Sequence, residues 1–227
     1  MKIIKAKNKR ELSEIASEII IGEIKKNPRL VLGFATGKTP LKTYKKLVKA
    51  YKNGKVDFSK VKTFNLDEFY PPSSKKDEKR NYAYYMHKRV FDKLNIEKEN
   101  INLLDGNKRD WKKECKKYES KIKKNPIDLQ ILGIGVNGHI GFNEPGSKIN
   151  SLTRLVQLTH IEGKGLTMGI STIMKTKKII LLAFGRKKAK AIYGMVNGKV
   201  SEELPASFLR KHKNVVVIVD RKAGRLL

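Results

Sequence analysis

The residues best suited to proton chemistry lie in a glycine-rich stretch of the chain. Residues 133–145 read GIGVNGHIGFNEP, with four glycines around a single histidine, His139. Glycines allow sharp backbone turns that can present a side chain, and an imidazole gives or takes a proton near neutral pH. Glu144 can orient this ring and stabilise its charge. We predict a functional His139, and the alternative is a histidine with a purely structural role.

Two adjacent carboxylates form the second candidate. They belong to the segment FNLDEFY, residues 64–70, at the end of an expected strand. Neighbouring carboxylates can divide into a base and a structural partner when their environments differ. This pattern makes Asp67 a candidate base. The alternatives are a solvated loop, or carboxylates that cap the start of a helix.

Two further loops have the composition of anion-binding turns. The segment TGKTP, residues 36–40, joins an expected strand to an expected helix, and its glycine lets the backbone approach a ligand. Free N–H groups at a helix start, with threonine hydroxyls, suit a phosphate. The segment GRKKA, residues 185–189, offers a cation in a similar place. The alternatives are a tight turn with a helix cap, and chance placement of lysines.

The elements that must position these loops alternate between strand-like and helix-like segments. Compact apolar runs predict strands at residues 30–35, 61–66, 127–134, 179–184 and 215–219. Apolar residues at helical spacing predict helices after Asn8, after Pro40, and over residues 82–94 and 110–123. This alternation is typical of a three-layer α/β sandwich with a mostly parallel, Rossmann-like open sheet, here one domain over residues 1–227. Ligands of such sheets bind beyond the carboxyl ends of the strands, where all four loops are expected.

Composition restricts the classes of partner. Lys and Arg number 51 against 22 Asp and Glu, a net charge of +29 that attracts anions. The cations are spread along the chain without a nucleic-acid-binding motif, so we expect only non-specific affinity for polyanions. One cysteine, Cys115, on the apolar side of an expected helix, predicts a core residue and a reducing, cytoplasmic setting. We expect no signal peptide, no membrane-spanning segment and no metal site.

Taken together, the loops resemble those of the glucosamine-6-phosphate deaminase/isomerase family, which shares its fold with 6-phosphogluconolactonases. The similar segments, in family order, are GFATGKTP, FNLDEFY, NYAYYMHKRVF, ENINLLDG, ILGIGVNGHIGFNEPGS, SLTRLVQLT, LTMGIST and LPASFL. The resemblance implies conversion of glucosamine 6-phosphate and water into fructose 6-phosphate and ammonia, a hydrolase-type C–N cleavage that needs no metal or coenzyme. The implied partner is the amino-sugar phosphate, and a homo-oligomer is possible.

The resemblance also implies a role for each matching residue. Asp67 matches the general base that moves a proton from C2 to C1 of the opened sugar. His139 matches the residue that assists ring opening, with Glu144 as its carboxylate partner. Asn137 stands where some members have aspartate, and it can hold the histidine by a hydrogen bond. The positions that surround the phosphate are matched by Thr36, Gly37, Lys38, Thr39 and Lys188.

One connection departs from the family pattern. Between SLTRLVQLT and LTMGIST the chain has only residues 160–165, where the family places a longer lid that carries an arginine. A shorter lid predicts a more open site, with Lys164 as a candidate substitute for the arginine. Two other functions remain open: a 6-phosphogluconolactonase-like hydrolase, and a non-catalytic protein that binds sugar phosphates or polyanions.

Overall fold

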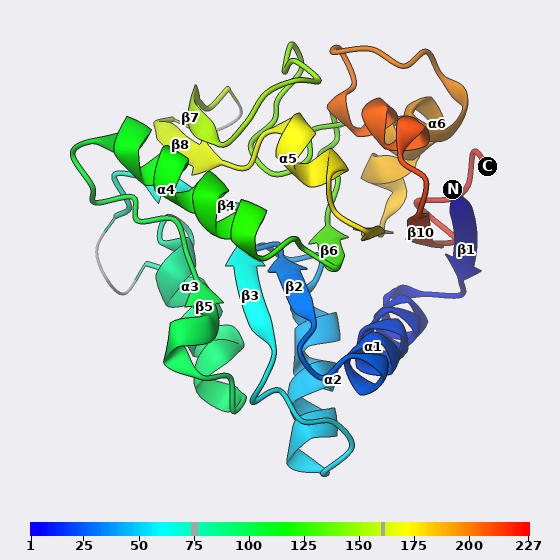
Figure 1. Ribbon diagram of the computed structural model, residues 1–227. Helices are drawn as coiled ribbons and strands as arrows, with labels where there is room; N and C mark the ends of the chain where they lie inside the picture. The colour runs from blue at the N-terminus through cyan, green and yellow to red at the C-terminus, as the bar shows by residue number, and fades with distance from the viewer. Residues whose placement is uncertain (74–76, 160–161) are drawn as a thin grey trace.

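A seven-stranded parallel sheet forms the centre of the molecule (Figure 1). The computed structural model describes residues 1–73, 77–159 and 162–227. The strand order is β1-β10-β9-β6-β2-β3-β5. The strands are β1 (Lys2–Ala6), β2 (Val31–Phe34), β3 (Lys62–Asn65), β5 (Ile101–Asn102), β6 (Leu129–Leu132), β9 (Lys178–Ala183) and β10 (Val215–Asp220). The chain runs outward from β2 to one edge and from β6 to the other, so the order reverses between β2 and β6.

Apolar runs explain the inner strands. All residues of β6 and β10 are buried, as is usual for parallel strands covered on both faces. The five predicted strands are confirmed, with ends shifted by at most two residues. Strands β1 and β5 were not predicted, because β1 is a mostly exposed edge strand and β5 has only two residues.

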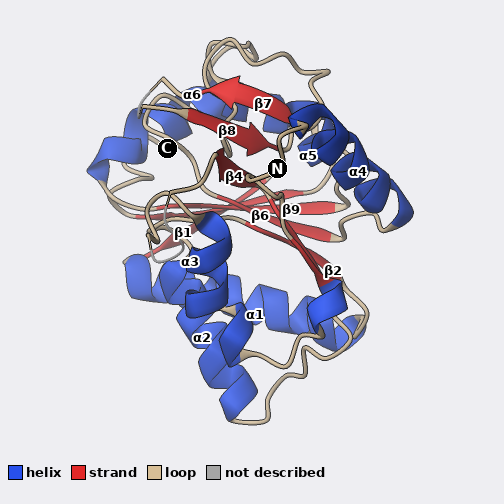
Figure 2. Ribbon diagram, turned by 90° about the vertical axis from the view of Figure 1, so that its left-hand side faces the viewer, coloured by secondary structure: helices blue, strands red, loops and turns tan. Residues whose placement is uncertain are grey.

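Helices cover both faces of this sheet (Figure 2). Side chains of β9 alternate between the two cores: Ile180 and Leu182 face one, Ile179 and Leu181 the other. The first core includes residues of α1 (Lys9–Lys26), α2 (Leu41–Lys52) and α3 (Tyr82–Arg89), and the second those of α4 (Trp111–Lys124), α5 (Ile170–Met174) and α6 (Ala189–Asn197). The predicted three-layer α/β architecture is therefore confirmed.

Local sequence sets the helix ends. The Asn8 side chain accepts hydrogen bonds from the N–H groups of Arg10 and Glu11, so it caps α1 as its sequence context predicts. The predicted helix over residues 82–94 is too long, because α3 ends at Arg89. Val90 leaves the helical conformation at φ −134°, and the chain packs into the core through a 3-10 turn, Phe91–Lys93. Further 3-10 turns are Lys98–Asn100, Arg186–Lys188 and Pro205–Lys211.

A second, antiparallel sheet was not predicted. It contains β4 (Asp67–Tyr70), β7 (Arg154–Gln157) and β8 (Lys164–Thr167) in the order β4-β8-β7. Its register pairs Asp67 with Thr167 and Tyr70 with Lys164. The sheet lies on the side of α4 and α5 (Figure 2). The two carboxylates of FNLDEFY therefore begin a strand, which corrects the expectation of a loop.

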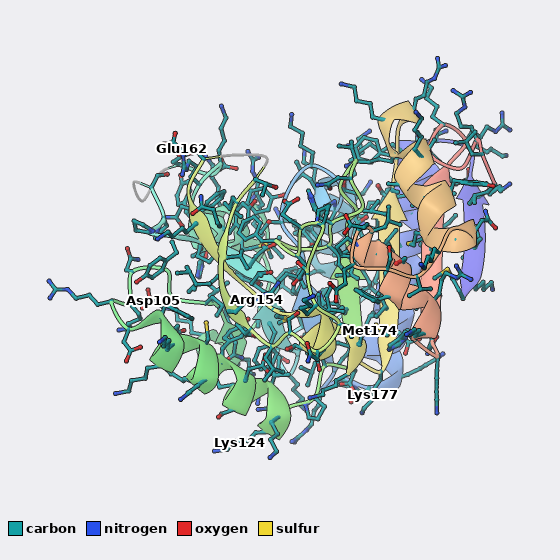
Figure 3. All side chains as sticks on the ribbon, turned by 90° about the horizontal axis from the view of Figure 1, so that it is seen from above. Asp105, Lys124, Arg154, Glu162, Met174 and Lys177 are labelled. Carbon is teal, nitrogen blue, oxygen red and sulfur yellow. The ribbon has the colours of Figure 1, made fainter. Side chains whose placement is uncertain are left out.

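The thiol of Cys115 is buried on the inner side of α4, as predicted. Burial raises the pKa of this thiol to about 11, which disfavours a reactive thiolate. Seen from above, α4 runs along one side of the molecule, from near Asp105 to Lys124 (Figure 3). Among the described residues, no helix is long and apolar enough to cross a membrane.

Candidate active site

Three loops and the start of β4 meet in a cavity of about 190 Å³ at the carboxyl edge of the sheet. They follow β2, β3, β6 and β9, and they flank the point where the strand order reverses. The cavity lining includes most of the predicted site residues, namely Thr36, Gly37, Lys38, Thr39, Asp67, His139 and Lys188. Asn137 and Glu144 do not line it. They contact the histidine loop instead.

The loop after β2 exposes its backbone to the cavity. Gly37 has φ +93°, a conformation that favours glycine, and a Cβ there would meet no atom within 4 Å. The Tyr85 hydroxyl donates to the Gly37 carbonyl at 2.8 Å and so holds the turn. Pro40 caps α2, and its side chain makes no capping hydrogen bond, so the helix start offers N–H groups to an anion.

Asp67 is a buried carboxyl in the wall of this cavity. Burial, together with the nearby charge of Glu68, raises the pKa of Asp67 from 3.8 to about 7, and Thr36 opposes this by donating to Oδ1 at 3.5 Å. A Cβ on Gly141 would stand 3.5 Å from Oδ2 of Asp67, at φ +57°. This glycine therefore lets the histidine loop approach the carboxyl closely. A carboxyl with a pKa near 7 has the properties of a general base at neutral pH.

Glu68 has a different environment although it is the next residue. Its carboxylate accepts hydrogen bonds from the N–H groups of Phe69, Tyr82 and Ala83, at 2.6–2.8 Å. Two of these donors belong to the first turn of α3. Burial raises the pKa of Glu68, while the three backbone donors favour its charged form. Asp67 thus faces the cavity, as expected of a candidate base. Glu68 binds the start of a helix, as expected of a capping carboxylate.

His139 stands opposite a buried carboxylate. Its Nδ1 lies 3.3 Å from Oε1 of Glu144. The ring packs on Gly135, where a Cβ would lie 2.4 Å from Nδ1. The backbone N–H of Gly135 donates to the His139 carbonyl at 2.9 Å, which closes the turn. Nδ1 is thus the ring nitrogen turned toward Glu144, and the imidazole lines the cavity.

Asn137 acts on the loop and not on the imidazole. Its Nδ2 donates to Oε2 of Glu144 at 2.7 Å, and its Oδ1 accepts from the backbone N–H of His139 at 3.3 Å. The expected hydrogen bond between Asn137 and the histidine is therefore to the backbone. Asn137 orients Glu144, which in turn faces the ring.

Lys188 is the cation of the loop after β9. It ends the 3-10 turn Arg186–Lys188 and lines the cavity half-buried, whereas Arg186 and Lys187 are exposed. Burial lowers the pKa of Lys188, since the charged form loses hydration. It makes no ion pair with any residue in the described part of the chain. An anion bound in the cavity would stabilise the charged form of Lys188.

Two aromatic residues of the cavity were not predicted. Tyr82 and Phe142 line it, with their rings stacked at 5.7 Å, and both contact the ring of Phe69. They lie within the segments NYAYYM and GFNEP, whose residue types alone do not distinguish a cavity-lining aromatic residue from any other. Lys164, the candidate substitute cation, pairs with Tyr70 at the far end of β8 and does not line the cavity.

The remaining histidines lie elsewhere. His87 is hydrogen-bonded to Asp92, and His212 to the carbonyl of Thr176, while His160 lies outside the described residues. Over residues 1–73, 77–159 and 162–227, no three or more His, Cys, Asp or Glu side chains are grouped to hold a metal ion.

Comparison with known proteins places this geometry in context. Residues 5–218 match the family described as glucosamine-6-phosphate isomerases/6-phosphogluconolactonase. A glucosamine-6-phosphate deaminase of Clostridium novyi (strain NT) is 47% identical over 243 aligned positions, with all of both chains covered. A solved monomeric glucosamine-6-phosphate deaminase has a TM-score of 0.95 at 37% identity, again over all of both chains. A 6-phosphogluconolactonase from Trypanosoma brucei has a TM-score of 0.84 at 20% identity, covering 100% of this chain and 98% of that one, which shows a shared fold.

The alignment length reveals a difference in chain length. The alignment with the Clostridium novyi relative has 243 positions, and this chain has 227 residues, so 16 positions have no residue in this chain. The chain is thus shortened within a fold that it otherwise shares over its whole length.

Proposed function

Because the chain belongs to the family of glucosamine-6-phosphate isomerases and 6-phosphogluconolactonases, we propose that its cavity deaminates glucosamine 6-phosphate to fructose 6-phosphate and ammonia. The observation that carries this proposal is the convergence of the Asp67 carboxyl and the His139 imidazole on one cavity. An isomerising deamination needs both a base for a carbon acid and a proton carrier for a ring oxygen.

Phosphate binding positions the sugar in this proposal. The Thr36–Thr39 turn offers backbone N–H groups and hydroxyls, and Lys38 and Lys188 offer positive charge. The net charge of +29 attracts the anionic substrate over longer distances. With the phosphate held there, the sugar extends toward Asp67, whose Oδ1 lies 3.5 Å from the Thr36 hydroxyl.

Ring opening is the first chemical step. His139 moves a proton from the O1 hydroxyl to the ring oxygen while the C1–O5 bond breaks, so the imidazole ends in its starting state. The Glu144 carboxylate, 3.3 Å from Nδ1, stabilises the imidazolium that forms in between.

Proton transfer between carbons follows. Ionised Asp67 takes the proton from C2, the electron pair forms a C1=C2 bond, and the carbonyl oxygen at C1 receives a proton that the C2 ammonium group gives up. Asp67 then returns its proton to C1, which leaves a C2=N bond. Water adds to C2 and ammonia leaves, giving the ketone. Water supplies the oxygen, so the cleavage is hydrolytic in this proposal. Neither a metal nor a coenzyme takes part, and the reducing cytoplasm suits the free thiol of Cys115.

Product analysis tests the proposal. The protein is incubated with glucosamine 6-phosphate, and ammonia and fructose 6-phosphate are measured, with galactosamine 6-phosphate and 6-phosphogluconolactone as rival substrates. We expect equal amounts of the two products from glucosamine 6-phosphate. Asp67→Asn should lower kcat by about 10²–10⁴-fold, which is the contribution of a positioned base. Faster lactone hydrolysis than deamination, or an Asp67→Asn variant as active as the parent, would contradict the assignment.

A further inference from the structure

Arg80 lies close to the cavity although it does not line it. Its guanidinium carbon is 5.5 Å from the centre of the Phe69 ring. On β4, Phe69 follows Asp67 by two residues, so both side chains point to the same face of the strand. Arg80 therefore lies over the face of β4 that carries the cavity carboxyl.

A small cluster of aromatic rings separates this guanidinium from the cavity, with Phe69 beneath Arg80 and the cavity-lining rings beyond it. The Phe69 ring lies 4.9 Å from that of Tyr82 and 5.4 Å from that of Phe142, between ring centres. Tyr82 and Phe142 both line the cavity. Arg80 is exposed and lies outside this cluster, so a contact with a ligand in the cavity mouth requires its long side chain to change rotamer around the rings.

The β7–β8 hairpin leaves room for Arg80. Nη2 of Arg80 donates to the carbonyl of Glu162 at 2.8 Å, near the hairpin tip at the periphery of the molecule (Figure 3). Gly163 has φ +114°, and a Cβ there would lie 2.6 Å from the same nitrogen. The backbone of the hairpin thus accommodates a guanidinium at this position.

Arg80 is held only weakly where it stands. The residue is exposed, and among the described residues the guanidinium donates one hydrogen bond, to the Glu162 carbonyl, which leaves most of its five N–H donors for other acceptors. A neutral carbonyl is a weaker acceptor than a phosphate oxygen, and a guanidinium binds phosphate through two parallel hydrogen bonds.

We propose that Arg80 is an anion-binding residue of this site. Its guanidinium gives up the hydrogen bond to the Glu162 carbonyl and donates to the phosphate of a bound sugar instead. Lys38 and Lys188 supply point charges from the loops after β2 and β9. Arg80 adds a planar donor from the rim formed by β4 and the β7–β8 hairpin. The identity of the sugar rests on the proposed function, whereas the phosphate contact does not.

Inorganic phosphate and glucosamine 6-phosphate together test this role. The variants are Arg80→Ala, Arg80→Lys and the matched control Lys79→Ala, which removes a charge from the adjacent exposed position. Phosphate affinity is measured by calorimetry on the full chain, and KM and kcat by ammonia release. We expect Arg80→Ala to weaken phosphate binding and raise KM about tenfold each, the effect of one charge-assisted hydrogen bond, with kcat changed less than about threefold. Arg80→Lys should be intermediate, and Lys79→Ala within twofold of the parent.

Any of three results would overturn the proposal. The first is an Arg80→Ala variant whose phosphate affinity equals that of Lys79→Ala. The second is a loss of kcat and of thermal stability at unchanged phosphate affinity, since Arg80 would then only tether the hairpin. Absence of phosphate binding by the parent chain would also count against it. If the parent binds phosphate but does not deaminate, the calorimetry still decides the role of Arg80 while the proposed function fails.

Discussion

Replacing Asp67 by asparagine should stabilise the protein while it removes the activity. Asparagine keeps the shape of the side chain and an oxygen for the Thr36 hydroxyl, but it never carries a charge. In the parent, burial and the charge of Glu68 raise the pKa of Asp67 from 3.8 to about 7. Ionised Asp67 is therefore unfavourable in the folded state, and the substitution relieves this.

The sign and size of the effect follow from the two pKa values. Below about pH 3.8 the carboxyl is protonated in both the folded and the unfolded chain, and it adds no penalty. Between about pH 4 and 7 the unfolded chain loses its proton first, so the parent loses stability as the pH rises, and the loss is complete above about 7. The difference between 3.8 and about 7, at 1.36 kcal/mol per pKa unit, amounts to about 4 kcal/mol.

Urea unfolding between pH 4 and 8.5 measures this directly. The free energy of unfolding of Asp67→Asn minus that of the parent should rise with pH and level off above about pH 7, at up to about 4 kcal/mol. The control is Glu97→Gln, which removes an exposed carboxyl. Its free energy of unfolding minus that of the parent should not show this rise with pH. A difference that does not change with pH, or that falls, would refute the claim that burial of Asp67 disfavours its charge.

The same carboxyl should control the pH dependence of catalysis. If ionised Asp67 is the base, kcat/KM rises with pH and approaches a plateau above an apparent pKa near 7, which belongs to the free enzyme. Stability and activity should therefore change in opposite directions over this interval. A rising limb centred near pH 4 would show that Asp67 has an ordinary pKa or is not the base.

Two further substitutions examine the histidine loop. Glu144→Gln should lower kcat about 10²-fold or more, because an amide facing Nδ1 cannot stabilise the imidazolium, and steady-state kinetics with intact thermal stability checks this. Gly135→Ala should lower kcat/KM about 10²-fold and the free energy of unfolding by about 1–3 kcal/mol, since its Cβ would stand 2.4 Å from Nδ1 of His139. Gly22→Ala, where a Cβ meets nothing within 4 Å, is the control, and equal losses in both glycine variants would contradict the steric explanation.

The sequence allowed the five inner strands of the central sheet to be predicted, but neither its two edge strands nor the second sheet. Strand β10 is an unbroken apolar run, and such a run has few options other than a strand buried on both faces. Strand β8, Lys164–Thr167, contains a lysine and a glycine, and only its pairing with β4 makes it a strand. Its existence depends on contacts distant in sequence, which local composition does not encode.

The site was predictable to a similar degree. Residue types marked His139 and the Thr36–Thr39 turn as candidates, although the turn alone was equally consistent with a tight turn and a helix cap. A division between Asp67 and Glu68 into a base and a structural partner was expected, but the structural partner's contact with the start of α3 was not, since it depends on which face of β4 meets that helix. Arg80 gave no signal either, because its neighbours come from β4 and the hairpin.

Alternation along β4 has a consequence for how the chain can change length. Glu68 accepts hydrogen bonds from the start of α3, and Asp67 faces the cavity. One residue inserted before this strand without compensation would therefore turn each of the two side chains to the opposite face of the strand. The proposed base, Asp67, would then face α3, and Glu68 would face the cavity. We expect length variation to be tolerated at the open tip of the β7–β8 hairpin and in the connection after β4. Within the four residues from Asp67 to Tyr70, by contrast, substitutions can be tolerated, but a change in length would change which side chain faces the cavity.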